Sequence, residues 1–248
     1  SGPPLIALHR IPRSSEDLAA FIQSASKYFT VIAPDLAGYG NSFALDAPPE
    51  SLDPLCDDLE ALRLALGLGR ILLYGEQAGA ALALAYACRH PNHVVALATW
   101  DLDLPGALDL PLGAKASLPP FEPKWDGSHF AWLWAMLREQ TAFHPWHTPA
   151  LNTRVDADMP GPAELHRRAV QFLNAGQHGR GYESGFNAAR TFDAPNVLSS
   201  VNKPALVVAR QRHEAKDPWR GIASVSNDLH RSIADERTRG EAQCLSFL

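Results

Sequence analysis

The feature that most constrains the fold is an apolar run at residues 71–74, followed by a glycine-bounded turn and an apolar segment at residues 80–90. A short apolar run bounded by turn residues is typical of a buried strand, and a longer one of a helix. The turn between them reads Gly75-Glu76-Gln77-Ala78-Gly79. These residues therefore predict a strand, a tight turn and a helix in direct succession.

The same alternation continues along the chain. Further apolar runs at residues 5–8, 29–33, 94–99 and 205–209 predict four more strands, while residues 14–28 and 51–66 carry apolar side chains at helical spacing. Strands that alternate with helices favour a mostly parallel sheet with helices on both faces. The predicted fold class is therefore α/β.

The alternation breaks between residues 104 and 196. This stretch is rich in Trp, His and Pro and has helical pieces near residues 130–143 and 163–175. We predict that residues 104–196 form a helical cap inserted after the strand near 94–99, on a core made of residues 1–103 and 197–248.

Composition excludes several classes of protein. The 248 residues carry a net charge of −5 with no long block of one sign, so nucleic-acid binding is not expected. Three widely spaced cysteines argue against a disulfide framework and favour a cytoplasmic protein. The apolar stretch at 80–88 is too short to span a membrane, and the first residues show no signal-peptide pattern. We expect a monomer or homodimer without a cofactor.

Three motifs carry a resemblance to a known family. Residues 34–42 read P-D-L-A-G-Y-G-N-S and resemble the P-D-x-x-G-x-G-x-S segment of α/β-hydrolases. Residues 72–79 resemble the strand, elbow and helix unit of the same superfamily, and residues 182–190 are similar to the end of the cap in epoxide hydrolases and dehalogenases. The resemblance implies an α/β-hydrolase sheet with a cap and a degenerate catalytic triad.

The nucleophile position of the elbow holds Gln77, where family members place Ser, Cys or Asp. In this superfamily the strained turn exposes that side chain at the mouth of the sheet. A carboxamide donates and accepts hydrogen bonds but cannot form an ordinary acyl- or alkyl-enzyme. The resemblance therefore predicts an elbow without a nucleophile.

The oxyanion loop departs from the family as well. The family's His-Gly is His9-Arg10 here, and Ile11 follows. Backbone N–H groups of Arg10 or Ile11, together with that of Ala78, remain able to bind an oxygen anion. If Arg10 points inward, it favours an anionic ligand; otherwise it faces solvent.

The acid and the histidine of the triad are also displaced. The usual acid slot falls near His213, with Glu214 and Asp217 close by, and Asp101 and Asp103 fit an alternative acid at the end of the preceding strand. No His follows His230, and the strand and histidine loop before the terminal helix look deleted or very short. The chain also resembles one that starts at the third strand of the usual fold.

The cap supplies aromatic side chains. Trp132 and Trp146 are predicted either to line a pocket for a small apolar ligand with a polar group or to pack the cap onto the main domain. His144 and His147 are spaced three apart, but Pro145 disfavours a helical presentation and no metal site is expected there.

Two functions remain open. In the first, the chain is a hydrolase-like or lyase-like enzyme in which Glu76, Asp101 or a histidine activates water or abstracts a proton. In the second, it is a non-catalytic binder or partner subunit that has kept the pocket and lost the triad. An enzyme requires ionisable groups that converge on one reacting point, within about 3 Å.

Overall fold

The computed structural model describes residues 2–43, 45–46, 49–102, 121–143, 159–175, 183–210, 229–234 and 237–248. Within these residues six strands form one sheet in the order β2-β1-β3-β4-β5-β6, and every neighbouring pair is parallel. The strands are β1 (Pro4–Leu8), β2 (Thr30–Ile32), β3 (Ile71–Glu76), β4 (Val94–Trp100), β5 (Ala205–Arg210) and β6 (Leu229–Ala234).

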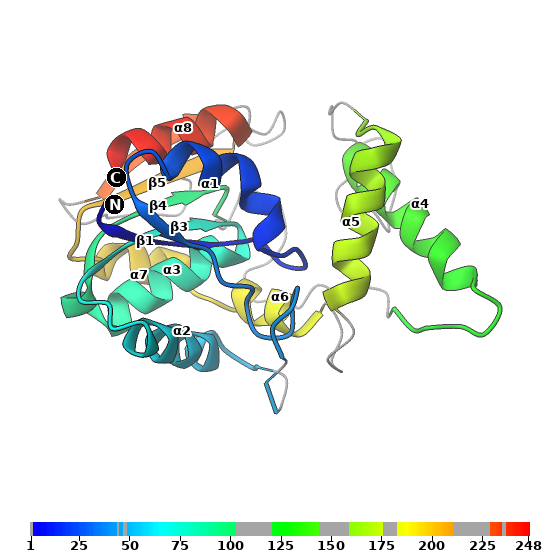
Figure 1. The fold of residues 1–248 in the computed structure, drawn as a ribbon, viewed down its shortest axis with the longest axis horizontal. Coiled ribbons are helices and arrows are strands. Elements are labelled where there is room, and N and C mark those ends of the chain that lie inside the picture. The colour runs from blue at the N-terminus through cyan, green and yellow to red at the C-terminus, as the bar shows by residue number, and fades with distance from the viewer. Residues whose placement is uncertain are drawn as a thin grey trace.

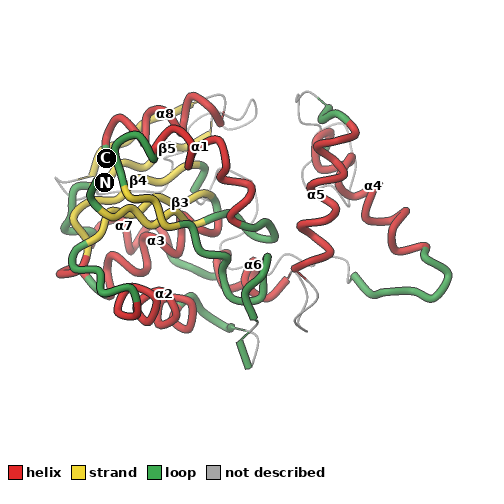
Figure 2. Tube along the Cα trace, viewed as in Figure 1, coloured by secondary structure: helices red, strands yellow, loops and turns green. Residues whose placement is uncertain are grey.

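Helices cover both faces of this sheet (Figure 1), which confirms the predicted α/β class. Along the chain they are η1 (Ser15–Leu18), α1 (Ala19–Ala25), α2 (Asp53–Ala65), α3 (Ala78–Arg89), η2 (Pro91–His93), α4 (Ser128–Ala142), α5 (Pro162–Ala175), α6 (Glu183–Arg190), α7 (Ala194–Ser200) and α8 (Arg237–Phe247). Figure 2 shows the strands stacked between α1 and α8 on one side and α2, α3 and α7 on the other. The helices of the described residues contain no segment long and apolar enough to cross a lipid bilayer.

Strand β3 explains how one sheet serves two apolar cores. Ile71 and Leu73 belong to the cluster under α2 and α3, whereas Leu72 and Tyr74 belong to the cluster under α1 and α8. Successive side chains of a strand point to opposite faces, so a strand buried on both sides must be apolar throughout. This is why residues 71–74 form a continuous apolar run.

The order of the strands fixes where a site can form. From β1 the chain first adds β2 on one side. It then crosses to the other side of β1 to form β3, and β4 follows further out on that side. In open parallel sheets, ligands bind at the carboxyl ends of the strands where the strand order reverses. Here the reversal lies between β1 and β3, whose ends carry His9 and Gln77.

Two glycines allow the sharp turn between β3 and α3. A Cβ on Gly75 would lie 2.3 Å from the carbonyl oxygen of Gly79, and one on Gly79 would lie 2.4 Å from the carbonyl oxygen of Leu8. Backbone therefore packs directly on backbone at both positions. Gly79 is what lets the start of α3 rest on the end of β1.

Two expectations near the end of the chain are wrong. The strand before the terminal helix is present as β6, paired with β5 along its whole length. His230 lies in this strand, not in a helix, and its exposed ring lies 5.5 Å from that of Phe247. The apolar signal of β6 was weak because Arg231 and Ser232 interrupt it.

Helices α4 and α5 lie between β4 and β5 in sequence and stand to one side of the sheet in Figure 1. They share a separate apolar cluster, which consists of Leu133, Met136, Leu137, Leu165 and Phe172. Most of the remaining residues between 103 and 158 lie outside the described part of the chain. The predicted boundaries of the cap therefore stay a prediction.

The packing of the turn makes a direct prediction. Gly79→Ala should lower the free energy of unfolding by about 3 kcal/mol, because the added methyl group meets the backbone of Leu8 and His9. Gly69→Ala is the matched control: nothing lies within 4 Å of its Cβ, and the change should stay within about 0.5 kcal/mol. Urea unfolding of both variants measures the difference, and equal effects would contradict the packing described here.

Candidate functional site

Gln77 occupies the corner between β3 and α3 with a φ of 49° and a ψ of −111°. Its N–H donates to the carbonyl of Trp100 at 3.0 Å, which extends the β3–β4 ladder by one residue. Its carbonyl accepts the N–H groups of Ala80 and Ala81 at 3.0 and 3.1 Å, which begins α3. The backbone is thus fixed on both sides, and these bonds offset the cost of a positive φ, which is about 1–3 kcal/mol for a non-glycine residue.

The side chain of Gln77 is bound to Asp101. Its Nε2 donates to Oδ2 of Asp101 at 2.9 Å. A carboxylate can only accept, so the amide nitrogen must face Asp101, and Oε1 keeps its acceptor capacity. The structure therefore brings together two of the three residues predicted as catalytic.

Asp101 directly follows β4 and is 3% exposed. Its N–H donates to the carbonyl of Val208 at 2.9 Å, and its own φ is 55°. Gln77 and Asp101, which follow the neighbouring strands β3 and β4, are thus two non-glycine residues with positive φ that contact each other. Such conformations cluster at functional sites in proteins.

Glu76, the third predicted catalytic residue, lies on the face covered by α1 and α8. Its carboxylate accepts Tyr74 Oη at 2.8 Å, and Nη2 of Arg237 lies 3.0 Å from Oε1 and 2.9 Å from Oε2. Burial raises the pKa of nearby Glu241 to about 7, and the charge of Glu76 acts in the same direction. Glu76 thus forms an ion pair with Arg237, the first residue of α8.

His9 is fully buried at the end of β1. The N–H of Leu36 donates to its Nε2 at 2.9 Å, and its Nδ1 lies 3.0 Å from the carbonyl of Arg10. These partners require a neutral ring with the proton on Nδ1, and burial lowers the pKa of His9 in agreement. The ring orients two backbone segments and has no nitrogen left for a substrate.

Arg10 and Ile11 follow on the same loop. Arg10 Nε donates to Oδ2 of Asp17 at 2.6 Å, so its charge is paired within the protein. Ile11 is 5% exposed and packs with Tyr39 into the core under α2 and α3. A Cβ on Gly185 of α6 would lie 2.9 Å from Ile11, so α6 is held close to this loop.

The sequence matches a family model described as alpha/beta hydrolase fold over residues 3–234, which is most of the chain. The chain belongs to this family. The elbow at Gln77, the following helix α3 and the parallel sheet are therefore the shared framework of α/β-hydrolases, as the motifs predicted.

Curated relatives agree with this assignment. A haloalkane dehalogenase from Mesorhizobium japonicum is 35% identical over 105 residues, which are 42% of this chain and 34% of that protein. A soluble epoxide hydrolase from Corynebacterium is 32% identical over 110 residues, which are 44% of this chain and 37% of that protein. The matched segments thus span about a third of these relatives.

A solved structure of a hydrolase from Pseudomonas aeruginosa superposes with a TM-score of 0.70 at 20% identity, covering 99% of this chain and 89% of that chain. At this identity the likeness shows the α/β-hydrolase fold and not an activity.

Most of the other predicted site residues lie outside the described part of the chain. Trp132 of α4 is half-buried and packs against the apolar cluster shared by α4 and α5. Trp146 lies outside the described residues, as do His144 and His147. The alternative acid Asp103 and the usual acid slot near His213, with Glu214 and Asp217, also lie outside them.

Sequence reasoning missed the cations around this site. Arg237 binds Glu76 and also donates to the carbonyl of Asp17 at 2.8 Å. Burial, aided by Arg10, lowers the pKa of Arg13 to about 9, and its buried Nη1 has no hydrogen-bond partner within the described part of the chain. The available signal was the spacing of Arg10 and Arg13 beside Asp17, which is spread too widely to form a recognisable motif.

The contact between Gln77 and Asp101 predicts a pH-dependent variant. Gln77→Glu places two carboxyl groups about 2.9 Å apart, and such pairs raise the pKa of one member. A carboxyl group whose pKa is higher in the folded protein than in the unfolded chain leaves the folded state stable at low pH. As the pH rises above the unfolded pKa, the folded state loses stability. Relative to the native chain, the variant should therefore lose about 2–3 kcal/mol between pH 4 and pH 8.

Urea unfolding at several pH values measures this loss. Gln23→Glu on the exposed side of α1 is the matched control and should show no such trend. A pH-independent difference for Gln77→Glu would mean that its side chain does not face Asp101.

Proposed function

We propose that this α/β-hydrolase-fold chain binds a small apolar ligand with a polar group at the elbow, without covalent attachment to the elbow residue. The observation that carries the proposal is the hydrogen bond between the Gln77 carboxamide and Asp101. Relatives of this fold act through an attacking atom at that corner. The amide nitrogen has its lone pair delocalised and is already committed to Asp101.

The same geometry supports a binding role for the rest of the corner. Gln77 Oε1 is an acceptor for a hydroxyl or amide N–H of the ligand. The backbone N–H groups of Ala78, Arg10 and Ile11 are the proposed donors to a ligand oxygen. Trp132 and Trp146 of the proposed cap, residues 104–196, supply the apolar wall of the pocket.

Asp101 favours a second candidate function. Its carboxylate is buried next to the elbow, and a buried carboxylate can act as a general base toward a bound water. In this candidate Gln77 orients Asp101 and the chain is a slow hydrolase-like or lyase-like enzyme. Glu76 supports it less well, because accepting a proton would break the pair with Arg237.

Calorimetric titration with benzamide, benzyl alcohol and toluene tests the binding proposal. Gln77→Ala should weaken the two polar ligands about 3–10-fold, which corresponds to one net hydrogen bond, and leave toluene unchanged. Gln23→Ala makes the same chemical change on the surface and should alter none of them. Equal weakening of all three ligands, or no binding by the native chain, would contradict a polar contact at the elbow.

Hydrolysis of p-nitrophenyl acetate separates the two candidates. The binder predicts that native protein, Gln77→Ala and Asp101→Asn all match the uncatalysed rate. Turnover that disappears in Asp101→Asn and persists in Glu76→Gln would favour the general-base enzyme.

A further inference from the structure

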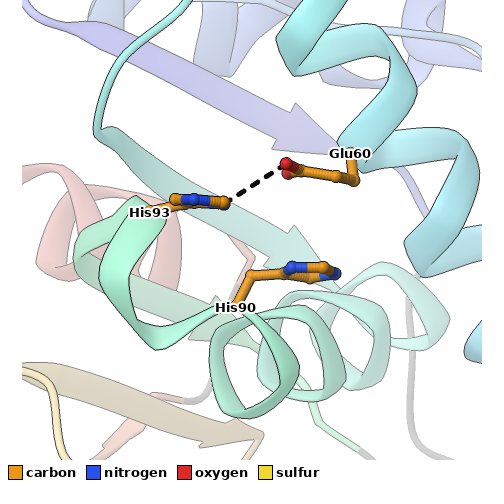
Figure 3. A group of neighbouring side chains, drawn as sticks. All are labelled: Glu60, His90 and His93. Atoms are coloured by element: carbon orange, nitrogen blue, oxygen red, sulfur yellow. Dashed lines mark ion pairs between the residues drawn. The ribbon is translucent and has the colours of Figure 1, made fainter.

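A second cluster of polar side chains lies at the amino ends of the strands, whereas the elbow lies at their carboxyl ends. Glu60 comes from α2, His90 directly follows α3, and His93 ends η2 immediately before β4 (Figure 3). Because β4 runs from Val94 to Trp100, His93 and Asp101 are separated by about 25 Å along the strand direction. The cluster is therefore independent of the proposed ligand site.

The three side chains converge. One ligand atom of each, a carboxylate oxygen and two ring nitrogens, lies within 4.8 Å of the others. His93 Nδ1 is 3.3 Å from Glu60 Oε1. Ligand atoms about 2.0–2.2 Å from a tetrahedral zinc ion lie about 3.3–3.5 Å apart, so His93 and Glu60 already have that separation. His90 would have to move by no more than about 1.4 Å.

The two histidine nitrogens are the second, independent observation. His90 Nε2 and His93 Nδ1 are both buried, and neither makes a hydrogen bond among the described residues. His93 Nδ1 faces Glu60 Oε1 at ion-pair distance, without hydrogen-bond geometry. Buried polar atoms nearly always form hydrogen bonds, so two buried ring nitrogens that form none, one of them facing a carboxylate, need an explanation. Their rings are almost parallel, with centroids 5.8 Å apart, and Tyr86 packs on His90 at 4.8 Å.

Glu60 is held in place by its other neighbours. Arg63 donates to both of its oxygens at 2.8 and 2.9 Å, and Tyr86 Oη donates to Oε2 at 2.5 Å. Each carboxylate oxygen has two lone pairs, so Oε1 can accept from Arg63 and still bind an ion. The charge of Arg63 offsets that of Glu60, which weakens the attraction for a cation and leaves the two imidazoles as the main ligands.

We propose that Glu60, His90 and His93 bind one divalent transition-metal ion. Two imidazoles and one carboxylate suit Zn²⁺ and similar ions better than Mg²⁺ or Ca²⁺, which prefer oxygen ligands. The bound ion links α2 to the turn between α3 and β4 and stabilises the fold far from the elbow. The His-Pro-x-His spacing considered at residues 144–147 thus recurs at residues 90–93, where the structure adds the third ligand.

The experiment uses the whole chain, stripped with a chelator and dialysed against Zn²⁺ alone. Elemental analysis should find one Zn²⁺ per chain, and calorimetry should give a Kd at least about tenfold weaker for His90→Ala and for His93→Ala. His166→Ala removes an exposed imidazole of α5 and should bind as the native chain does. The chain carrying both His144→Ala and His147→Ala should also keep its Zn²⁺.

The rise in Tm on adding Zn²⁺ is the second readout, because it is measured against each variant's own metal-free Tm. It should be present in the native chain and the controls and absent in His90→Ala and His93→Ala. No binding by the native chain, unchanged binding in both of these variants, or loss in the His144 and His147 variant instead would each overturn the proposal.

Discussion

The close packing of backbone on backbone where β3 turns into α3 is the constraint on which the remaining structure depends. Gly79 rests on the carbonyl of Leu8, and Gly75 rests on the carbonyl of Gly79. This contact brings the start of α3 to the end of β1 and forces the intervening residue to a positive φ. Whatever side chain stands there is presented at the point where the strand order reverses.

The two carboxylates beside this corner have different environments. Glu76 points to the α1 and α8 face, where Arg237 neutralises it, so it belongs to the framework. Asp101 lies on the other side of the corner and is bound by a neutral amide. Glu76 and Gln77 are consecutive, and successive side chains at a strand point to opposite faces of the sheet, so the two residues have different surroundings. Glu76 therefore contributes to stability, and Asp101 with Gln77 forms the proposed ligand site.

The fold was predictable because its signals are local and strong. The apolar run at residues 71–74 and the glycines of the turn identify β3, the elbow and α3, and the family motifs fix their arrangement. Strand β6 was missed because an interrupted apolar pattern carries too little periodicity to distinguish strand from helix.

The site was predictable only in part. Gln77 and Asp101 could be paired because both follow parallel strands that are neighbours in the sheet. The partner of Glu76 could not, since Arg237 is 161 residues away and meets it only through the packing of α8 on the sheet. The Arg10–Asp17 pair spans only seven residues, but no motif marks it. The Glu60, His90 and His93 cluster likewise joins segments that no short motif connects.

The most direct test of the central claim is intact-mass spectrometry of the native chain after incubation with a fluorophosphonate and, separately, with a small epoxide. Gln77→Cys is the positive control, because its thiolate gains one epoxide adduct more than the native chain if the reagent reaches the corner. The carboxamide elbow predicts an unchanged mass for the native chain with the fluorophosphonate and, with the epoxide, no adduct that peptide mapping places at the elbow. A covalent adduct mapped to the elbow or to a serine beside it would contradict non-covalent binding.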